Sequence, residues 1–118
     1  MFTLFTAYIL VTICTIVVNG FAAGADFSRA RFVLATMAEV RVPEPWLPLL
    51  GALKAAGAVG LLIGLLWFRL IGIAAAIGLV LFFIGAIATH IRTGVLYNIA
   101  FPGLFLALAV ASLVLTVA

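Results

Sequence analysis

Charged residues are scarce in this sequence, and their scarcity excludes most classes of protein. The 118 residues include six Lys or Arg and three Asp or Glu, together 8% of the chain, whereas 69% are apolar. A soluble domain carries about 25% charged residues. No water-soluble fold of this length covers so much apolar surface, so the lipid bilayer is the predicted solvent and partner. The basic residues are spread along the chain without forming a run, so we expect no nucleic-acid partner.

Cysteine and histidine are also nearly absent, with one residue of each, Cys14 and His90. A lone cysteine excludes an internal disulfide and a site built from several thiolates. Stable metal sites need three or four ligands, so we predict no metal site. We expect no covalently bound cofactor. No self-contained catalytic constellation is visible, and the sequence leaves open whether the protein is an enzyme.

Long apolar segments make up most of the chain. Four apolar segments are predicted to span the membrane, at about 2–24, 46–67, 71–90 and 102–118. About 20 apolar residues suffice to cross the hydrocarbon core. The predicted fold is an all-α bundle of four transmembrane helices in a single domain, 1–118. A short interfacial helix is expected in the polar connection 26–45, between the first and second spans. Segment 2–24 is no signal peptide in our interpretation, because it is too long and no basic residue precedes it.

Two stripes of side chains predict how the spans pack. Small residues recur at every fourth position of segment 46–67, at Ala52, Ala56, Gly60 and Gly64. In lipid, such a stripe lets another helix backbone approach closely. Polar residues three or four positions apart share one face of the first span, at Tyr8, Thr12, Thr15 and Asn19. We expect that face to contact other helices and not lipid.

Antiparallel threading of four spans is expected to gather polar residues at one membrane face. Lys54 lies eight residues beyond Trp46, about 12 Å along a helix. A cation at that depth is costly unless it is paired, so we expect an ion pair with Asp26 or Glu39. Five more candidate ligand-binding residues belong to the same face: Asn19, His90, Arg92, Tyr97 and Asn98. We predict that these residues share one polar hollow.

Each candidate also has a purely structural interpretation. Lys54 could extend its stem so that the ammonium reaches the interface, and His90 could hydrogen-bond the free carbonyls at a helix end. Arg92 could anchor to lipid phosphates. Tyr97 and Asn98 could satisfy backbone groups where the last helix begins. The sequence leaves both interpretations open.

The distribution of basic residues predicts an orientation. The two polar connections hold four arginines, Arg29, Arg31, Arg41 and Arg92, whereas the opposite side offers Arg69 and the amino terminus. Loops rich in Lys and Arg stay in the cytoplasm. We therefore expect an integral protein of a bacterial cytoplasmic membrane, with cytoplasmic polar connections and both termini outside.

Two motifs carry a resemblance to a known family. They are Gly51-Ala-Leu-Lys54-Ala-Ala-Gly57, continuing to Gly64, and His90-Ile-Arg92, with Pro102 opening the last span. This pattern, over about 46–109, resembles the DoxX-like family of small four-helix membrane proteins. That family takes its name from a membrane subunit associated with thiosulfate:quinone oxidoreductase. The resemblance therefore implies quinone-linked redox work.

Three function hypotheses follow. The leading one is an accessory subunit of a quinone-linked redox system that binds a quinone or other polar-headed lipid through Lys54, His90 and Arg92. The alternative is a non-enzymatic protein that packs against a larger membrane complex or forms a homo-oligomer. A small transporter or channel is the least favoured, because four short helices leave little room for a pore and no inverted repeat is visible.

Overall fold

The computed structural model describes residues 3–118 and is helical over nearly all of that range. Four helices are long: α1 (Leu4–Phe27), α3 (Leu47–Leu66), α4 (Arg69–Thr93) and α5 (Ala100–Val117). Each is long and apolar enough to cross a membrane. A short helix, α2 (Arg31–Glu39), and one 3-10 turn, η1 (Glu44–Trp46), lie between α1 and α3. The predicted all-helical fold, with a short helix between the first two spans, is confirmed.

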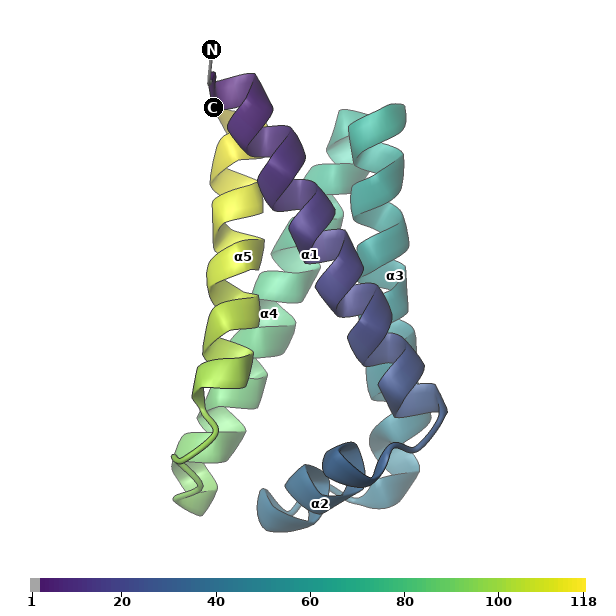
Figure 1. Ribbon diagram of the computed structural model, residues 1–118, viewed down its shortest axis with the longest axis vertical. Helices are drawn as coiled ribbons and strands as arrows, with labels where there is room; N and C mark the ends of the chain where they lie inside the picture. The colour runs from purple at the N-terminus through teal and green to yellow at the C-terminus, as the bar shows by residue number, and fades with distance from the viewer. Residues whose placement is uncertain (1–2) are drawn as a thin grey trace.

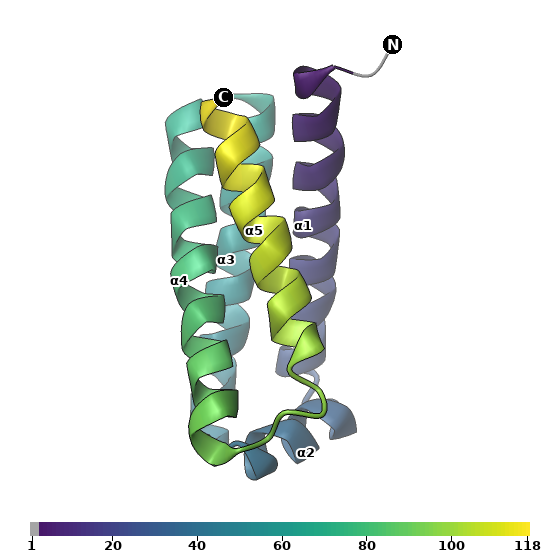
Figure 2. The same cartoon turned by 90° about the vertical axis from the view of Figure 1, so that its left-hand side faces the viewer.

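The four long helices form an elongated antiparallel bundle. The start of α1 and the end of α5 lie at one end, and α2 crosses the opposite end (Figures 1 and 2). Helix α1 packs against both α3 and α5. It is inclined, so that it lies beside α5 near its start and beside α3 near its end (Figure 1). The last turn of α1 is thereby delivered to α3, close to the end of the bundle that α2 covers.

Helix ends differ from the predicted spans. Helix α1 continues to Phe27, so Asp26 lies in its last turn and not in the polar connection. Helix α4 begins at Arg69 and ends at Thr93, which leaves a link of two residues after α3. No proline or glycine interrupts the extensions 25–27 and 91–93, so the helices continue. Residue 2, with which the first predicted span begins, lies outside the described residues.

Proline and left-handed residues set the helix boundaries. Pro48 lies in the first turn of α3, where proline is tolerated because that N–H has no helical partner. Gly94 follows the last residue of α4 and has a φ of 73°, a left-handed conformation that favours glycine. The Val95 N–H then donates to the His90 carbonyl at 3.0 Å and closes the helix end. Arg29, with φ 55°, separates α1 from α2.

Glycine lets α3 and α4 pack backbone against backbone. A Cβ added at Gly72 would lie 3.0 Å from the Gly64 Cα, and one added at Gly64 would overlap the Gly72 backbone. Gly60 similarly faces the Cβ of Ala75. Beside this contact lies the buried apolar core: Leu61, Ala76, Leu79, Phe83 and Ala109. The glycine contact thus holds α3 and α4 together along the core.

The small-residue stripe predicted on α3 packs over half its length. Gly60 and Gly64 are buried against α4, whereas Ala52 and Ala56 are exposed. The reason is helical geometry. With 3.6 residues per turn, a four-residue spacing drifts about 40° at every step. Ala52 and Ala56 have therefore rotated off the face that meets α4.

The polar face of α1 packs inward, as the sequence predicts. Thr12, Thr15 and Asn19 are buried. The hydroxyls of Thr12 and Ser112 lie 2.8 Å apart, which joins α1 to α5. Thr15 donates to the Val11 carbonyl at 2.8 Å, within its own helix. Hydroxyl contacts of this kind are typical of helices that pack together in lipid.

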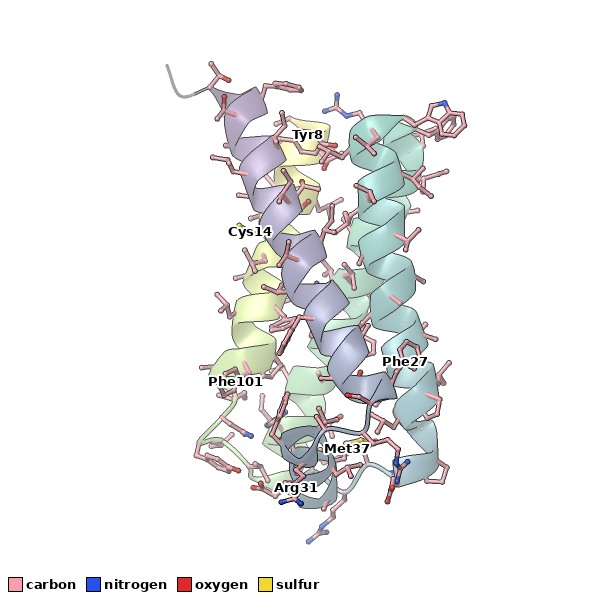
Figure 3. All side chains as sticks on the ribbon, turned by 45° about the vertical axis from the view of Figure 1, so that its right-hand side comes forward. Tyr8, Cys14, Phe27, Arg31, Met37 and Phe101 are labelled. Atoms are coloured by element: carbon pink, nitrogen blue, oxygen red, sulfur yellow. The ribbon has the colours of Figure 1, made fainter. Side chains whose placement is uncertain are left out.

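Helix α2 is amphipathic. Met37 is buried against the bundle, and Figure 3 shows it between α2 and the long helices, with Arg31 directed away from them. This is the arrangement expected of a helix that lies in the interface, with its apolar side toward the protein and lipid.

Candidate functional site

A buried ion pair joins α1 to α3. The Lys54 Nζ lies 2.9 Å from the Asp26 Oδ2 and donates a hydrogen bond to it. The Asp26 side chain is 2% exposed and that of Lys54 is 16% exposed. The ammonium also lies 5.5 Å from the centroid of the Phe82 ring, within cation–π range. Three helices, α1, α3 and α4, therefore meet at Lys54.

Gly51 allows the end of α1 to approach α3 closely enough for the ion pair to form. A Cβ at Gly51 would lie 3.1 Å from the Asp26 Cβ and 3.3 Å from the Phe27 ring, closer than most real contacts. Gly51 and Lys54 are three residues apart, so they lie on one face of α3. Sequence reasoning missed the roles of Gly51 and Phe82. The Gly51 spacing from Lys54 was a signal that could have found it, but no pattern in the sequence singled out Phe82.

The histidine belongs to the end of α4. His90 is buried, and its Nδ1 lies 3.0 Å from the Val95 carbonyl oxygen. Arg92 is exposed. Within residues 3–118, no hydrogen bond or ion pair joins Lys54 to either residue. His90 thus takes the helix-end role that the sequence left open, and the Lys54 pair is separate from it.

Neither candidate asparagine forms a hydrogen bond with Lys54 among residues 3–118. The Asn19 Nδ2 donates to the Thr15 carbonyl at 2.9 Å. The buried Oδ1 atoms of Asn19 and Asn98 accept no hydrogen bond from the described residues. Among residues 3–118, no hydrogen bond or ion pair joins any two of the six candidates. The hollow that they are expected to share stays a prediction.

Glu39 pairs with tyrosine and not with the lysine. The Tyr97 hydroxyl donates to the Glu39 Oε1 at 2.6 Å, and Tyr97 is 75% exposed. The expected ion pair of Lys54 with Asp26 or Glu39 is confirmed with Asp26 as the partner, and topology explains why the partner is not Glu39. Glu39 ends α2, which crosses the end of the bundle, whereas Asp26 is held against α3 by the last turn of α1 (Figure 1).

We expect the Tyr97–Glu39 bond to appear in a titration of the phenol. The pKa of Tyr97 is raised above 10.0, first by its hydrogen bond to the Glu39 carboxylate, then by desolvation and by the negative charge. Any stability the contact adds is present below the ordinary pKa and lost as pH rises through the raised one. With Tyr8→Phe removing the other tyrosine, phenolate absorbance should show Glu39→Gln lowering the Tyr97 pKa. Identical titrations with and without Glu39→Gln would contradict the contact.

Two open hollows on the surface lie near candidate residues. The larger, of about 630 Å³, lies between α3 and α4, and its lining includes Leu53, Gly57 and Phe82. The smaller, of about 260 Å³, is lined by Arg29, Glu44, Pro45 and Pro48 and contains the exposed Arg29–Glu44 ion pair. Neither is lined by His90 or Arg92. The larger one reaches the ring that lies beside the Lys54 ammonium.

The DoxX-like family model matches residues 10–112. The chain belongs to the DoxX-like family. The matched range contains the Lys54–Asp26 pair, His90, Arg92 and most of all four long helices. Family and helices together identify it as an integral membrane protein. No curated protein and no solved structure matches the chain significantly.

The opposite end of this DoxX-like bundle has its own arginine. Arg69 donates to the Thr116 carbonyl at the end of α5 and lies 6.0 Å from the Tyr8 ring centroid. These contacts connect the first residue of α4 to α1 and α5. For metals, residues 3–118 contain no group of three His, Cys, Asp or Glu that could hold an ion.

Proposed function

We propose that this DoxX-like protein is an accessory membrane subunit of a quinone-linked redox system, and that it binds the quinone headgroup beside Lys54. The observation that carries the proposal is the Lys54–Asp26 pair, 2.9 Å long and nearly buried within spanning helices. Ionisable groups at membrane depth are costly and therefore favour a functional role.

The ammonium has hydrogen-bonding capacity left over. A lysine carries three N–H donors, and Asp26 is its one hydrogen-bond partner among residues 3–118. The Phe82 ring beside it offers an aromatic surface for a flat ring. Because the Asp26 carboxylate already balances the charge, the pair favours a neutral headgroup with carbonyl oxygens over an anion. A quinone ring meets both requirements.

The structure supports a smaller set of headgroup ligands than the sequence did. His90 is bonded to the Val95 carbonyl, and Arg92 is exposed. We therefore assign the headgroup to Lys54 with Phe82, and leave to His90 its part in closing α4.

Quinone titration of the purified protein tests this function. Single loss of Lys54 would leave a buried carboxylate, so the informative variant is the double substitution Lys54→Met with Asp26→Leu, which replaces the pair by apolar side chains. With decyl-benzoquinone as probe, we expect saturable binding by the wild type and about a tenfold to hundredfold weaker Kd for the double variant, the value of a hydrogen bond to a charged group.

The matched control is Arg31→Met, which removes an exposed cation at the same end of the bundle. It should bind the probe as the wild type does. The function is refuted if the wild type shows no saturable binding, or if the double variant binds equally well.

A second function, a non-enzymatic protein that packs against a larger membrane partner or a second copy, is favoured by Ala52 and Ala56. These small residues are exposed on α3. Small residues on a lipid-facing surface allow another helix to approach closely. Purification in mild detergent with a stoichiometric partner, and without quinone binding, would favour this function over the first.

We also propose the orientation that the arginines indicate, in a bacterial cytoplasmic membrane with α2 on the cytoplasmic side. Three of the arginines, Arg29, Arg31 and Arg41, lie in the segment between α1 and α3. Labelling of a cysteine placed at Ala38 from the outside of intact cells, in a Cys14→Ala background, would contradict this orientation.

A further inference from the structure

The groove between α3 and α4 is apolar and is large enough to hold part of a small molecule. Its volume of about 630 Å³ falls within the range of small-molecule sites, about 300–1,000 Å³. Six small residues contribute to its lining: Ala56, Gly57, Gly60, Ala74, Ala75 and Gly78. Leu53, Ala56 and Ala74 are exposed, so the groove opens toward the surrounding lipid. No charged side chain lines it.

One end of the groove is coupled to the ion pair through a shared ring. Phe82 lines the groove and also lies 5.5 Å from the Lys54 Nζ. Leu53, the neighbour of Lys54 in sequence, lines the groove as well. An amphiphile in the groove would therefore have its polar end next to the ammonium.

We propose that this groove holds the hydrocarbon tail of the quinone whose headgroup contacts Lys54. The inference rests on the proposed function and adds the part of the ligand that the headgroup site does not bind. The α4 lining runs from Ile71 to Phe82, about 16 Å along the helix at 1.5 Å per residue. It runs from Phe82 toward the α3–α4 link, which is away from α2. A tail placed there points across the membrane.

The depth of Lys54 in the membrane favours a quinone headgroup over a phospholipid headgroup beside it. Lys54 lies about 12 Å along the helix from Trp46, well inside a core about 30 Å thick. A phosphate headgroup drawn to that depth would lose its hydration, and the Asp26 carboxylate 2.9 Å from Lys54 would repel it. A neutral ring loses far less on entering. The amphiphile whose polar end lies beside Lys54 is therefore assigned as a quinone, and its tail is the occupant assigned to the groove; an acyl chain of the surrounding lipid is the alternative occupant to be tested.

Two glycines of α4 provide a matched test. Gly78 lines the groove, whereas Gly85 does not. They are seven residues apart and so share a helix face, both are exposed, and a Cβ at either meets nothing within 4 Å. Leucine at 78 would fill the groove, and leucine at 85 adds the same bulk outside it. Ala74→Leu is a second groove-filling variant, in case Gly78→Leu folds poorly.

The probes are decyl-benzoquinone and the same ring with a methyl group in place of the tail, both titrated into protein in nanodiscs. Gly78→Leu and Ala74→Leu should weaken binding of the decyl probe about threefold to tenfold, the loss of the van der Waals contacts of one chain segment. They should leave the methyl probe unaffected, and Gly85→Leu should leave both probes unaffected.

Three results would overturn the inference. Equal binding of the decyl probe by the Gly78→Leu, Gly85→Leu and wild-type proteins would mean that ordinary lipid fills the groove. A change in oligomeric state with Gly78→Leu, at unchanged affinity, would assign the groove to a second copy. If the wild type binds neither probe, both the proposed function and this inference are refuted. If the wild type binds the methyl probe but the groove variants bind the decyl probe as the wild type does, only this inference fails.

Discussion

Replacing Asp26 by asparagine should lower the free energy of unfolding by about 3–5 kcal/mol, the cost of breaking a buried ion pair from one side. Asparagine keeps the shape of the side chain but removes the charge that balances the Lys54 ammonium, which is 2.9 Å away on a side chain that is 16% exposed. Denaturing-detergent titration of the protein in mixed micelles, followed by circular dichroism, measures the change.

The matched control is Glu44→Gln, the same acid-to-amide change in the exposed Arg29–Glu44 pair. Exposed pairs contribute about 0–1 kcal/mol, so this variant should unfold almost as the wild type does. Equal effects of Asp26→Asn and Glu44→Gln would show that Lys54 is solvated and not paired.

The double variant separates stability from function. Replacing both partners of a buried pair by apolar residues is often neutral or stabilising. Lys54→Met with Asp26→Leu should therefore unfold like the wild type, although it is expected to bind the quinone probe more weakly. A pair that can be replaced without loss of stability is not needed for folding, and that result would be consistent with the proposed headgroup binding.

Gly64→Ala should be the second most damaging substitution, lowering the free energy of unfolding by about 1–3 kcal/mol through overpacking. The added methyl group would overlap the backbone of Gly72, and backbone cannot rotate out of the way as a side chain can. Helices α3 and α4 would have to separate along their contact. Unfolding in mixed micelles measures the loss.

Gly85→Ala is the control for Gly64→Ala. Its added Cβ meets nothing within 4 Å. Because alanine favours the helix over glycine by up to about 1 kcal/mol, the control should be neutral or slightly stabilising. If both alanine variants unfold alike, α3 and α4 do not pack as closely as the structure has them.

Much of the fold was predictable because lipid imposes simple rules. Apolar runs of sufficient length must be helices, since every backbone group needs a hydrogen-bond partner in the bilayer. The polar face of α1 followed from spacing alone, and Thr12 and Thr15 do lie against α5. These features depend on one segment at a time, which is what a sequence pattern records.

The candidate site was harder to predict, because the depth of a residue in the membrane does not say in which direction its side chain points. Hydropathy places Lys54 and His90 near the same membrane face, but it does not say which neighbour each side chain meets. The inclination of α1 brings Asp26 to Lys54, and the course of α2 takes Glu39 to Tyr97. Likewise, the groove beside Phe82 is formed by two helices together, so neither helix shows it alone.

The sequence allows one direct measurement of the central claim, that the Lys54–Asp26 pair receives a quinone headgroup. Lys54 is the one lysine and Asp26 the one aspartate in the chain, so ¹⁵N-lysine and ¹³C-aspartate labels each report a single side chain. Solid-state NMR in bilayers should show a dipolar contact between the Lys54 Nζ and the Asp26 Cγ, and the ammonium signal should shift saturably on adding decyl-benzoquinone. The absence of that contact, or an ammonium signal that quinone leaves unchanged, would contradict the account.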